Sequence, residues 1–376
     1  MHAARAPNDA DTVCTALRGG RPRSRSAGRP CYARGSMPSP ARAVLDPRLR
    51  AVVVARQPLF YSDGADVATD RPAHVRAGSA LVRVGARLVV VQDDAAFLAV
   101  LEEDGTVRAV PLPYAPGGVR QFDEGRGNKA QKLDLEACTT LPDGRLLALG
   151  SGSSEVRDRA VLADLRGASD GLPTLRLVRL QALYAALHAR HDLSGSRLNL
   201  EGAAVLPTLG VLRLFQRGNG EPRGGFLPLD ATCDLPLDAL LRYLDAPETV
   251  APPTITDVVR WDLGALGDTR LTFTDACAAH ERLFFLAAAE ASPSAIDDGP
   301  VAGVVLGVMA SLSAQTSARV APLVDERGEP FRAKAEGLAF DLDDPTRALV
   351  VLDVDDAARP TELCTLRLDG PWREPA

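Results

Sequence analysis

Short apolar runs and turn residues alternate along the chain, and the same arrangement recurs five times. Each unit opens with a polar residue at the head of an apolar strand. These residues are Glu136 in LDLEACTT, Glu201 in LNLEGAAV, Glu336 in AEGLAFD and, in weaker copies, Asp275 in FTDACAA and Ser79 in GSALVRV. In chain order they stand 57, 65, 74 and 61 residues apart. Internal periods of this length predict a repeat architecture.

The units share a layout of about four short strands rich in leucine and β-branched residues, separated by turn residues. The predicted strands are 80–84, 87–93, 96–102 and 106–112; then 135–141, 145–151, 159–165 and 174–180; then 202–207, 211–217, 224–230 and 255–263; then 275–280, 282–289, 302–309 and 318–324; and finally 336–341, 347–354 and 363–368. Residues 180–192 and 236–245 instead carry apolar side chains at helical spacing and predict two short helices.

The fifth unit lacks one strand, and the apolar run 49–59 has no unit of its own. Pairing this run with 363–368 would complete the last unit and remove an exposed sheet edge. The sequence therefore predicts an all-β fold, a five-bladed β-propeller of four-stranded blades whose ring is closed by an N-terminal strand. A two-sheet sandwich is the alternative, but it would not explain why a polar residue recurs at one place in every unit.

Charge divides the 376-residue chain in two. Residues 1–43 hold eight Arg and two Asp, and their Gly, Ser and Pro content predicts a disordered tail or, alternatively, an organelle transit peptide. Residues 44–376 form the predicted propeller domain with a net charge of −12, which argues against nucleic-acid binding. No run of 18 apolar residues predicts a membrane span. Six cysteines without a CxxC pair indicate reduced thiols and a cytoplasmic protein.

In a propeller, the first strand of each blade lines the central channel, so the five polar residues would converge there. Carboxylates that share one site repel each other unless a cation compensates them. An all-oxygen set of Ser79, Glu136, Glu201, Asp275 and Glu336 favours Ca²⁺, with Mg²⁺ as the alternative, and disfavours zinc. The competing interpretation is that these acids form ion pairs with nearby bases such as Lys132 and Lys334.

These motifs resemble the calcium-dependent, apyrase-type nucleotidases, which are five-bladed propellers with one channel calcium ringed by first-strand Ser and Glu residues. The order of Ser79, Glu136, Glu201 and Glu336 is similar, as are KAEGLAF at 334–340, the Asp93–Asp94 pair in VVVQDDA and Arg217 in LRLFQRGNG. The family's aromatic residue beside its second-blade Glu is replaced here by Ala137. The phytase- and esterase-like propellers are more loosely similar.

The resulting functional hypothesis is a metal-dependent hydrolase that acts on a phosphate ester or anhydride at the channel mouth. Asp93 or Asp94 would be the base, and Arg217, Lys132 and Lys334 would hold the oxygens of a small anionic substrate. Two alternatives stay open. One is a non-catalytic ligand-binding propeller with a structural cation, and the other is a glycoside hydrolase that uses two channel carboxylates.

Overall fold

The computed structural model describes residues 39–166, 173–291 and 299–374. This part of the chain is nearly all-β, with 49% strand against 11% helix. Most of the predicted disordered tail, residues 1–38, lies outside the described residues. Strand β1 (Ala41–Leu45) pairs parallel with β14 and β19, so the predicted domain boundary at residue 43 falls inside an ordered strand.

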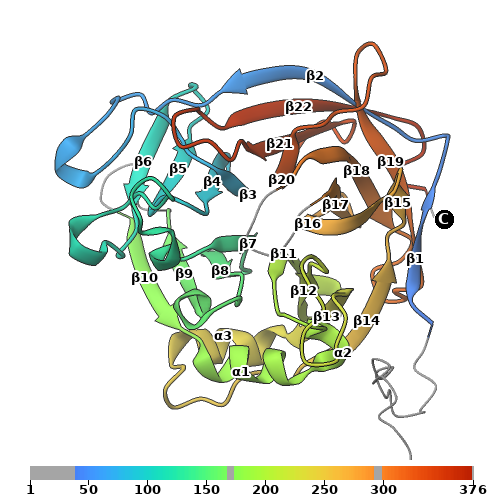
Figure 1. Cartoon of the computed structure of the whole chain (residues 1–376), viewed down its shortest axis with the longest axis horizontal. Coiled ribbons are helices and arrows are strands. Elements are labelled where there is room, and N and C mark those ends of the chain that lie inside the picture. The colour runs from blue at the N-terminus through green and yellow to red at the C-terminus, as the bar shows by residue number, and fades with distance from the viewer. Residues whose placement is uncertain (1–38, 167–172, 292–298, 375–376) are drawn as a thin grey trace, which may run out of the picture. The chain divides into compact units, whose positions relative to one another are not determined.

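The strands form consecutive antiparallel units, shown in chain order from blue to red in Figure 1. The first unit is β3 (Gly78–Val84), β4 (Arg87–Gln92), β5 (Phe97–Leu101) and β6 (Val107–Pro111). The second is β7 (Leu135–Thr140), β8 (Leu146–Gly150), β9 (Arg159–Asp164) and β10 (Thr174–Arg179). The third is β11 (Leu200–Leu206), β12 (Val211–Gln216), β13 (Asp230–Pro236) and β14 (Thr256–Asp262).

The fourth unit is β16 (Thr269–Ala279), β17 (Arg282–Glu290), β18 (Val301–Met309) and β19 (Ser317–Asp325), with a short β15 (Ala265–Leu266) at its edge. The fifth contains β20 (Lys334–Phe340), β21 (Arg347–Asp353) and β22 (Glu362–Asp369). Its fourth strand is β2 (Arg50–Pro58), which pairs antiparallel with β22 from Arg50 opposite Asp369 to Pro58 opposite Glu362. The run 49–59 therefore lies against 363–368, as the sequence predicts.

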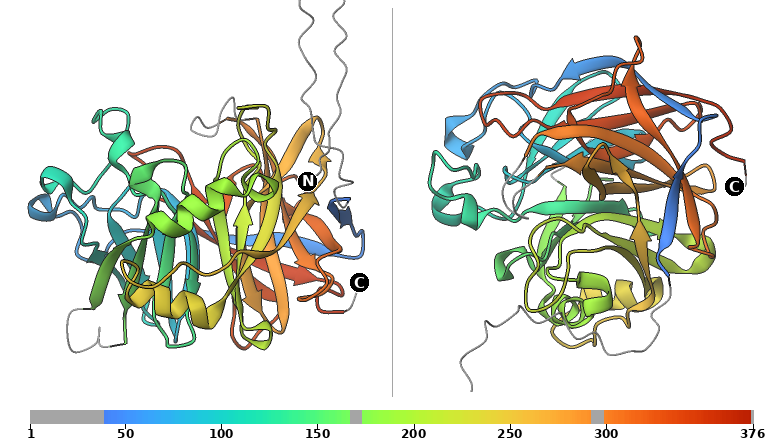
Figure 2. Two further views of the ribbon diagram at one scale, coloured as in Figure 1. Left: turned by 90° about the horizontal axis from the view of Figure 1, so that it is seen from below. Right: turned by 45° about the vertical axis from the view of Figure 1, so that its right-hand side comes forward.

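Apolar side chains fill the space between each unit and the next. Five hydrophobic clusters lie, in turn, between the first and second units, the second and third, the third and fourth, the fourth and fifth, and the fifth and first. The last of these packs Leu81 and Val90 of the first unit against Ala339 and Val351 of the fifth. The first strands β3, β7, β11, β16 and β20 lie side by side around a common centre (Figures 1 and 2).

Two predicted helical segments are confirmed. Residues 180–192 contain α1 (Gln181–Ala189) and the start of α2 (His191–Ser194), and residues 236–245 contain α3 (Leu237–Asp245). Helices α1 and α3 pack against the cluster between the second and third units through Tyr184 and Tyr243. Five single turns of 3-10 helix occur at Val67–Thr69, Pro116–Gly118, Lys129–Gln131, Glu155–Arg157 and Pro207–Leu209. None of the helices described is long and apolar enough to cross a membrane.

The predicted strand 224–230 is wrong. Gly224 and Gly225 lie in a turn, with φ values of 60° and 85°. The third strand of this unit is β13, which begins six residues after the predicted strand, at Asp230. Two buried acids, Asp230 and Asp234, interrupt the apolar pattern of β13 and conceal it in the sequence. Asp234 is neutralised by Arg213 on β12, with two N–O distances of 2.7 Å, a pairing visible only once the strands are in register.

Candidate functional site

Each first strand carries a β-bulge, where its register with the second strand of its unit shifts by one residue; the bulge is near the start of four strands and in the middle of β16. The bulged residues are Ser79, Glu136, Glu201, Thr274 and Glu336. Bulges redirect a side chain out of the regular alternation and are frequent beside functional sites. Four of the five recurrent polar residues predicted from sequence thus occupy equivalent positions in the structure.

The fourth position is a correction. Thr274, not the predicted Asp275, occupies the bulge of β16. The Thr274 hydroxyl donates to the carbonyl of Ala335 at 2.9 Å, just as the Ser79 hydroxyl donates to the carbonyl of Leu135 at 2.5 Å. Asp275 instead accepts the backbone N–H of Leu338 on β20 at 2.6 Å, and burial raises the pKa of its carboxyl well above the usual value.

Glycine follows two of the bulged glutamates because neighbouring first strands approach closely there. A Cβ on Gly202 would lie 2.9 Å from the backbone nitrogen of Ala276, and one on Gly337 would lie 2.5 Å from that of Leu81. Real Cβ atoms do not tolerate such contacts with backbone. The recurrent Glu-Gly pair therefore combines an acid at the bulge with a residue small enough for neighbouring first strands to approach closely.

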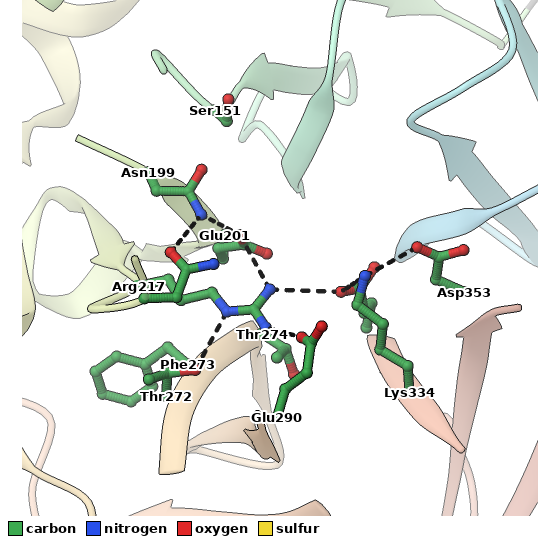
Figure 3. Close-up of polar contacts among 12 residues, drawn as sticks. Ser151, Asn199, Glu201, Arg217, Thr272, Phe273, Thr274, Glu290, Lys334 and Asp353 are labelled. Atoms are coloured by element: carbon green, nitrogen blue, oxygen red, sulfur yellow. Dashed lines mark hydrogen bonds and ion pairs between the residues drawn. The ribbon is translucent and has the colours of Figure 1, made fainter. Parts of the chain in front are cut away.

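Arg217, which follows β12, contacts two of the bulged glutamates, Glu201 and Glu336, and also Glu290 at the end of β17. Figure 3 labels Arg217 with Glu201 and Glu290. The Arg217 guanidinium is 2.5 Å from Glu290, 3.3 Å from Glu201 and 3.6 Å from Glu336. Its Nε donates to the Thr272 hydroxyl at 3.2 Å. Burial acts to lower the pKa of Arg217, but the three carboxylates outweigh it and raise this pKa above the usual value. Arg217 is thus engaged by the protein's own acids rather than directed to an open surface.

Lys334 is engaged in the same way. Its ammonium lies 3.0 Å from Asp353, 3.2 Å from Glu336 and 3.5 Å from Asp355. Glu336 links the two cations, because it contacts both Arg217 and Lys334. Figure 3 shows Arg217 beside Glu201 and Lys334 beside Asp353. Two of the three predicted anion-binding cations therefore form the ion pairs that the sequence left as the competing interpretation.

The third cation, Lys132, contacts Asp93 and lies 2.8 Å from Asp134. Asp134 also accepts from Arg157 at 2.8 Å and from the Ser151 hydroxyl at 2.5 Å. Sequence reasoning did not select Asp134. One signal in the sequence marked it, because it is an acid two residues before Glu136. In the structure Asp134 precedes β7 and has a φ of 54°, which is unusual for a non-glycine residue.

Glu136 is the exception in this network. Among the residues that the structure describes, no hydrogen bond or ion pair reaches its carboxylate, although its residue is only 8% exposed. Carboxylate oxygens of Asp93, Asp134 and Glu136 all lie within 4.8 Å of one another. Burial and then the charges of Asp134, Glu201 and Asp93 raise the pKa of Glu136 well above the usual value.

The adjacent Asp94 faces a different partner. Its Oδ2 accepts from Arg76 at 2.5 and 2.9 Å, whereas the Oδ1 atoms of both Asp93 and Asp94 are buried without a hydrogen-bond partner. Burial and the neighbouring Asp93 raise the pKa of Asp94 to about 7. Asp94 therefore lies beside the acidic centre but is held by an arginine of its own.

Negative charge exceeds positive charge across the connected centre. Eight carboxylates face four cationic side chains, a formal excess of four negative charges among the described residues. The members are Asp93, Asp134, Glu136, Glu201, Glu290, Glu336, Asp353 and Asp355 with Lys132, Arg157, Arg217 and Lys334. Excess buried charge of this kind must bind protons or a cation.

The opposite ends of the first strands surround a cavity of about 670 Å³, with Cys138, Cys277 and Phe340 among its lining residues. Burial raises the pKa of both thiols, Cys277 to about 12, so neither is a reactive thiolate at neutral pH. This cavity is predominantly apolar and lies away from the bulged residues. The polar chemistry is concentrated at the other end of the strands.

A family profile described as "Family of unknown function (DUF6929)" matches residues 74–368, and the chain belongs to this family. No curated protein matches the chain.

Among solved structures, glutaminyl cyclase from Myxococcus xanthus is similar, with 13% identity over 89% of this chain and 100% of that chain at a TM-score of 0.44. Virginiamycin B lyase from Staphylococcus aureus has 10% identity over 85% and 99%, with a TM-score of 0.37. The gluconolactonase XC5397 from Xanthomonas campestris has 13% identity over 85% and 97%, with a TM-score of 0.35. Likenesses this distant assign no activity.

Proposed function

We propose that the units form a closed five-bladed propeller, with β2 completing the fifth blade. The pairing of β2 with β22 and the apolar cluster between the fifth and first units support this closure. Removing residues 1–60 deletes β2 and should leave an unfolded or aggregated chain by circular dichroism, whereas removing residues 1–38 should not. A cooperative, undiminished melting transition after the longer deletion would show that the ring does not depend on β2.

We further propose that the acidic centre binds one hard divalent cation, Ca²⁺ with Mg²⁺ as the alternative. The observation that carries this is Glu136, a buried carboxylate without a partner, directed at Asp93 and Asp134. All the donors are oxygens, which suits calcium. Lys132 neutralises only part of this cluster. Glu201 and Glu336, at the bulges of β11 and β20, would add further negative charge near the cation. Ser79 and Asp275 are hydrogen-bonded to backbone groups.

The activity we propose is hydrolysis of a phosphate ester or anhydride. The bound cation would supply Lewis-acid polarisation of the phosphoryl oxygens. Asp93 holds an unpartnered oxygen beside the cluster and would accept the proton of the attacking water, as its O–P bond forms and the bond to the leaving oxygen breaks. Asp94, with its raised pKa, would be the second acid–base group. Arg217 would act by holding Glu201 and Glu336 in place rather than by contacting substrate.

A non-catalytic ligand-binding propeller is the second candidate, because the ion pairs of Arg217 with Glu290 and Glu336 join the third unit to the fourth and fifth units across the centre. In that case the cation and the ion pairs would only hold the blades together. For either function we propose a cytoplasmic location, which the free thiols of all four described cysteines support.

Turnover separates the two candidates. Purified protein, stripped with chelator and reloaded with Ca²⁺ or Mg²⁺, would be assayed for phosphate release from nucleoside di- and triphosphates, sugar phosphates and an aryl phosphate. We expect metal-dependent turnover that falls at least about a hundredfold in Asp93→Asn. Glu362→Gln, at the exposed pair with Arg56, is the matched control and should be unaffected. Metal binding without turnover of any substrate would leave the non-catalytic function.

A further inference from the structure

A group of arginines next to the acidic centre has fewer carboxylate partners than Arg217. Arg157, Arg197 and Arg223 come from the segment after β8, the segment after α2 and the loop between β12 and β13. Arg157 has one carboxylate partner, Asp134. For Arg197 and Arg223 no ion pair with a carboxylate exists among the described residues. The Nε atoms of both Arg157 and Arg197 are buried and donate to nothing.

The two inner arginines converge on Ser153. The Arg157 guanidinium donates to the Ser153 hydroxyl at 2.5 Å, and Arg197 donates to the Ser153 carbonyl at 3.0 Å. Ser153 lies in the sequence GSGSS, whose Gly152 has a φ of 75° and packs so closely on Tyr184 that a Cβ there would lie 2.7 Å from the ring. This loop is therefore fixed against α1, and it fixes the two guanidinium groups in turn.

Arg223 is exposed but is held near Arg197 by the backbone. The turn from Arg223 to Phe226 is closed by two backbone hydrogen bonds of 3.0 and 2.9 Å, and Phe226 stacks on His191 of α2 at 4.0 Å between ring centroids. Ser196 then donates its N–H to the carbonyl of Leu227 at 3.0 Å. The two loops that carry Arg197 and Arg223 are thus joined directly.

Positive charge is crowded at this place. Burial and then the charges of Arg157 and Arg223 lower the pKa of Arg197, the direction opposite to that of the well-paired Arg217. An arginine that has lost hydration without gaining a carboxylate is costly unless an anion joins it. Guanidinium groups match phosphate oxygens with paired, charge-assisted hydrogen bonds.

We propose that Arg157, Arg197 and Arg223, with Ser153, bind a phosphate group of the substrate beside the cation site. Asp134 connects the two sites, since it contacts Arg157 and belongs to the cluster with Asp93 and Glu136. As part of a reaction this assignment rests on the proposed phosphohydrolase function, but phosphate binding itself does not. It also replaces the predicted anion-binding role of Lys132, Arg217 and Lys334, which the acids of the centre already neutralise.

Binding of inorganic phosphate, measured by titration calorimetry on calcium-loaded protein, tests the proposal without turnover. We expect saturable binding that weakens about ten- to a hundredfold in Arg197→Ala and in Arg223→Ala, since each removes charge-assisted hydrogen bonds. Arg242→Ala, an exposed arginine on α3, lowers the net charge equally and should leave the affinity unchanged. Melting temperatures in phosphate-free buffer would verify that the variants are folded. If Arg197→Ala does not fold, Arg223→Ala still tests the proposal, because Arg223 is exposed and its loss should not disturb folding.

The proposal is overturned if the wild type binds no phosphate at millimolar concentration, or if Arg223→Ala and a folded Arg197 variant bind it as tightly as the wild type. Tight binding of citrate or acetate with no binding of phosphate also overturns it. If phosphate binding depends on these arginines but no substrate is hydrolysed, the phosphate-binding site is supported and the proposed phosphohydrolase activity is rejected. Hydrolysis with an unchanged KM in both variants would sustain the activity and reject this site.

Discussion

Replacing Glu136 by Gln should stabilise the protein without metal and abolish its stabilisation by metal. The change keeps the shape of the side chain but removes an unpaired buried charge. At a separation of 4.8 Å, the limit within which the carboxylates of Asp93, Asp134 and Glu136 lie, two like charges repel by about 3.5 kcal/mol at an effective dielectric constant of about 20.

Glu136 faces two such acids, and the ammonium of Lys132 offsets roughly one of them, so the net repulsion is about 3 kcal/mol. Proton uptake sets an upper limit: at about pH 8, protonating a carboxyl with an unfolded-state pKa of about 4.5 costs about 5 kcal/mol. The repulsion lies below this limit. We therefore expect Glu136→Gln to raise the melting temperature by about 5 °C in chelator.

The assay is thermal unfolding at about pH 8, in chelator and with excess Ca²⁺. Calcium at about a hundredfold its Kd should stabilise the wild type by about 2.7 kcal/mol and the variant by far less. The difference in stability between the two proteins should therefore shrink or change sign when calcium is added. Glu362→Gln should follow the wild type under both conditions. The reasoning is refuted if Glu136→Gln melts below the wild type in chelator, or if calcium stabilises both proteins equally.

Two further outcomes follow from the same centre. Burial raises the folded-state pKa of Glu201 to about 7, so between about pH 4.5 and 7 the folded state binds more protons than the unfolded state. The free energy of unfolding without metal should therefore fall as the pH rises, by on the order of 3 kcal/mol for this group. Urea unfolding in chelator at about pH 5 and 7.5 measures this change, and a higher free energy of unfolding at the higher pH would contradict it. Arg217→Ala should lower the free energy of unfolding by about 3 to 5 kcal/mol, because it removes the buried cation that contacts Glu201, Glu290 and Glu336, and Arg217→Lys should be intermediate. Unchanged stability together with a raised KM would instead place Arg217 in contact with substrate.

Much of the fold could be read from local pattern. The apolar runs, the Glu-Gly pairs and the free strand 49–59 predicted the strands that the structure contains because strand formation depends on short-range alternation and turn residues. The miss at β13 has the same cause. Asp230 and Asp234 break the alternation. Their tertiary partners make these acids compatible with burial: Arg213 pairs with Asp234, and Asp230 pairs with Arg270 and accepts two backbone N–H groups.

The candidate site depended more on tertiary structure. The choice of Thr274 over Asp275 follows from a one-residue register shift that the sequence cannot display, since a shift of one reverses the face to which every side chain points. Asp134, in the sequence LDLE, belongs to the candidate site because its carboxylate contacts Lys132 and Arg157 in the folded chain.

By itself, the sequence determined the repeated strands, the recurrent acids at their heads and the excess of negative charge, because these depend on composition and short spacing. Only the tertiary structure decided which charges neutralise one another. Arg217 contacts acids of the fourth and fifth units, and Lys334 contacts three acids of its own unit. Among the described residues, Glu136 forms no ion pair with a cation and Arg197 forms none with a carboxylate. Electrostatic energy depends on distances of a few ångströms between side chains that are far apart in sequence, and folding alone sets those distances.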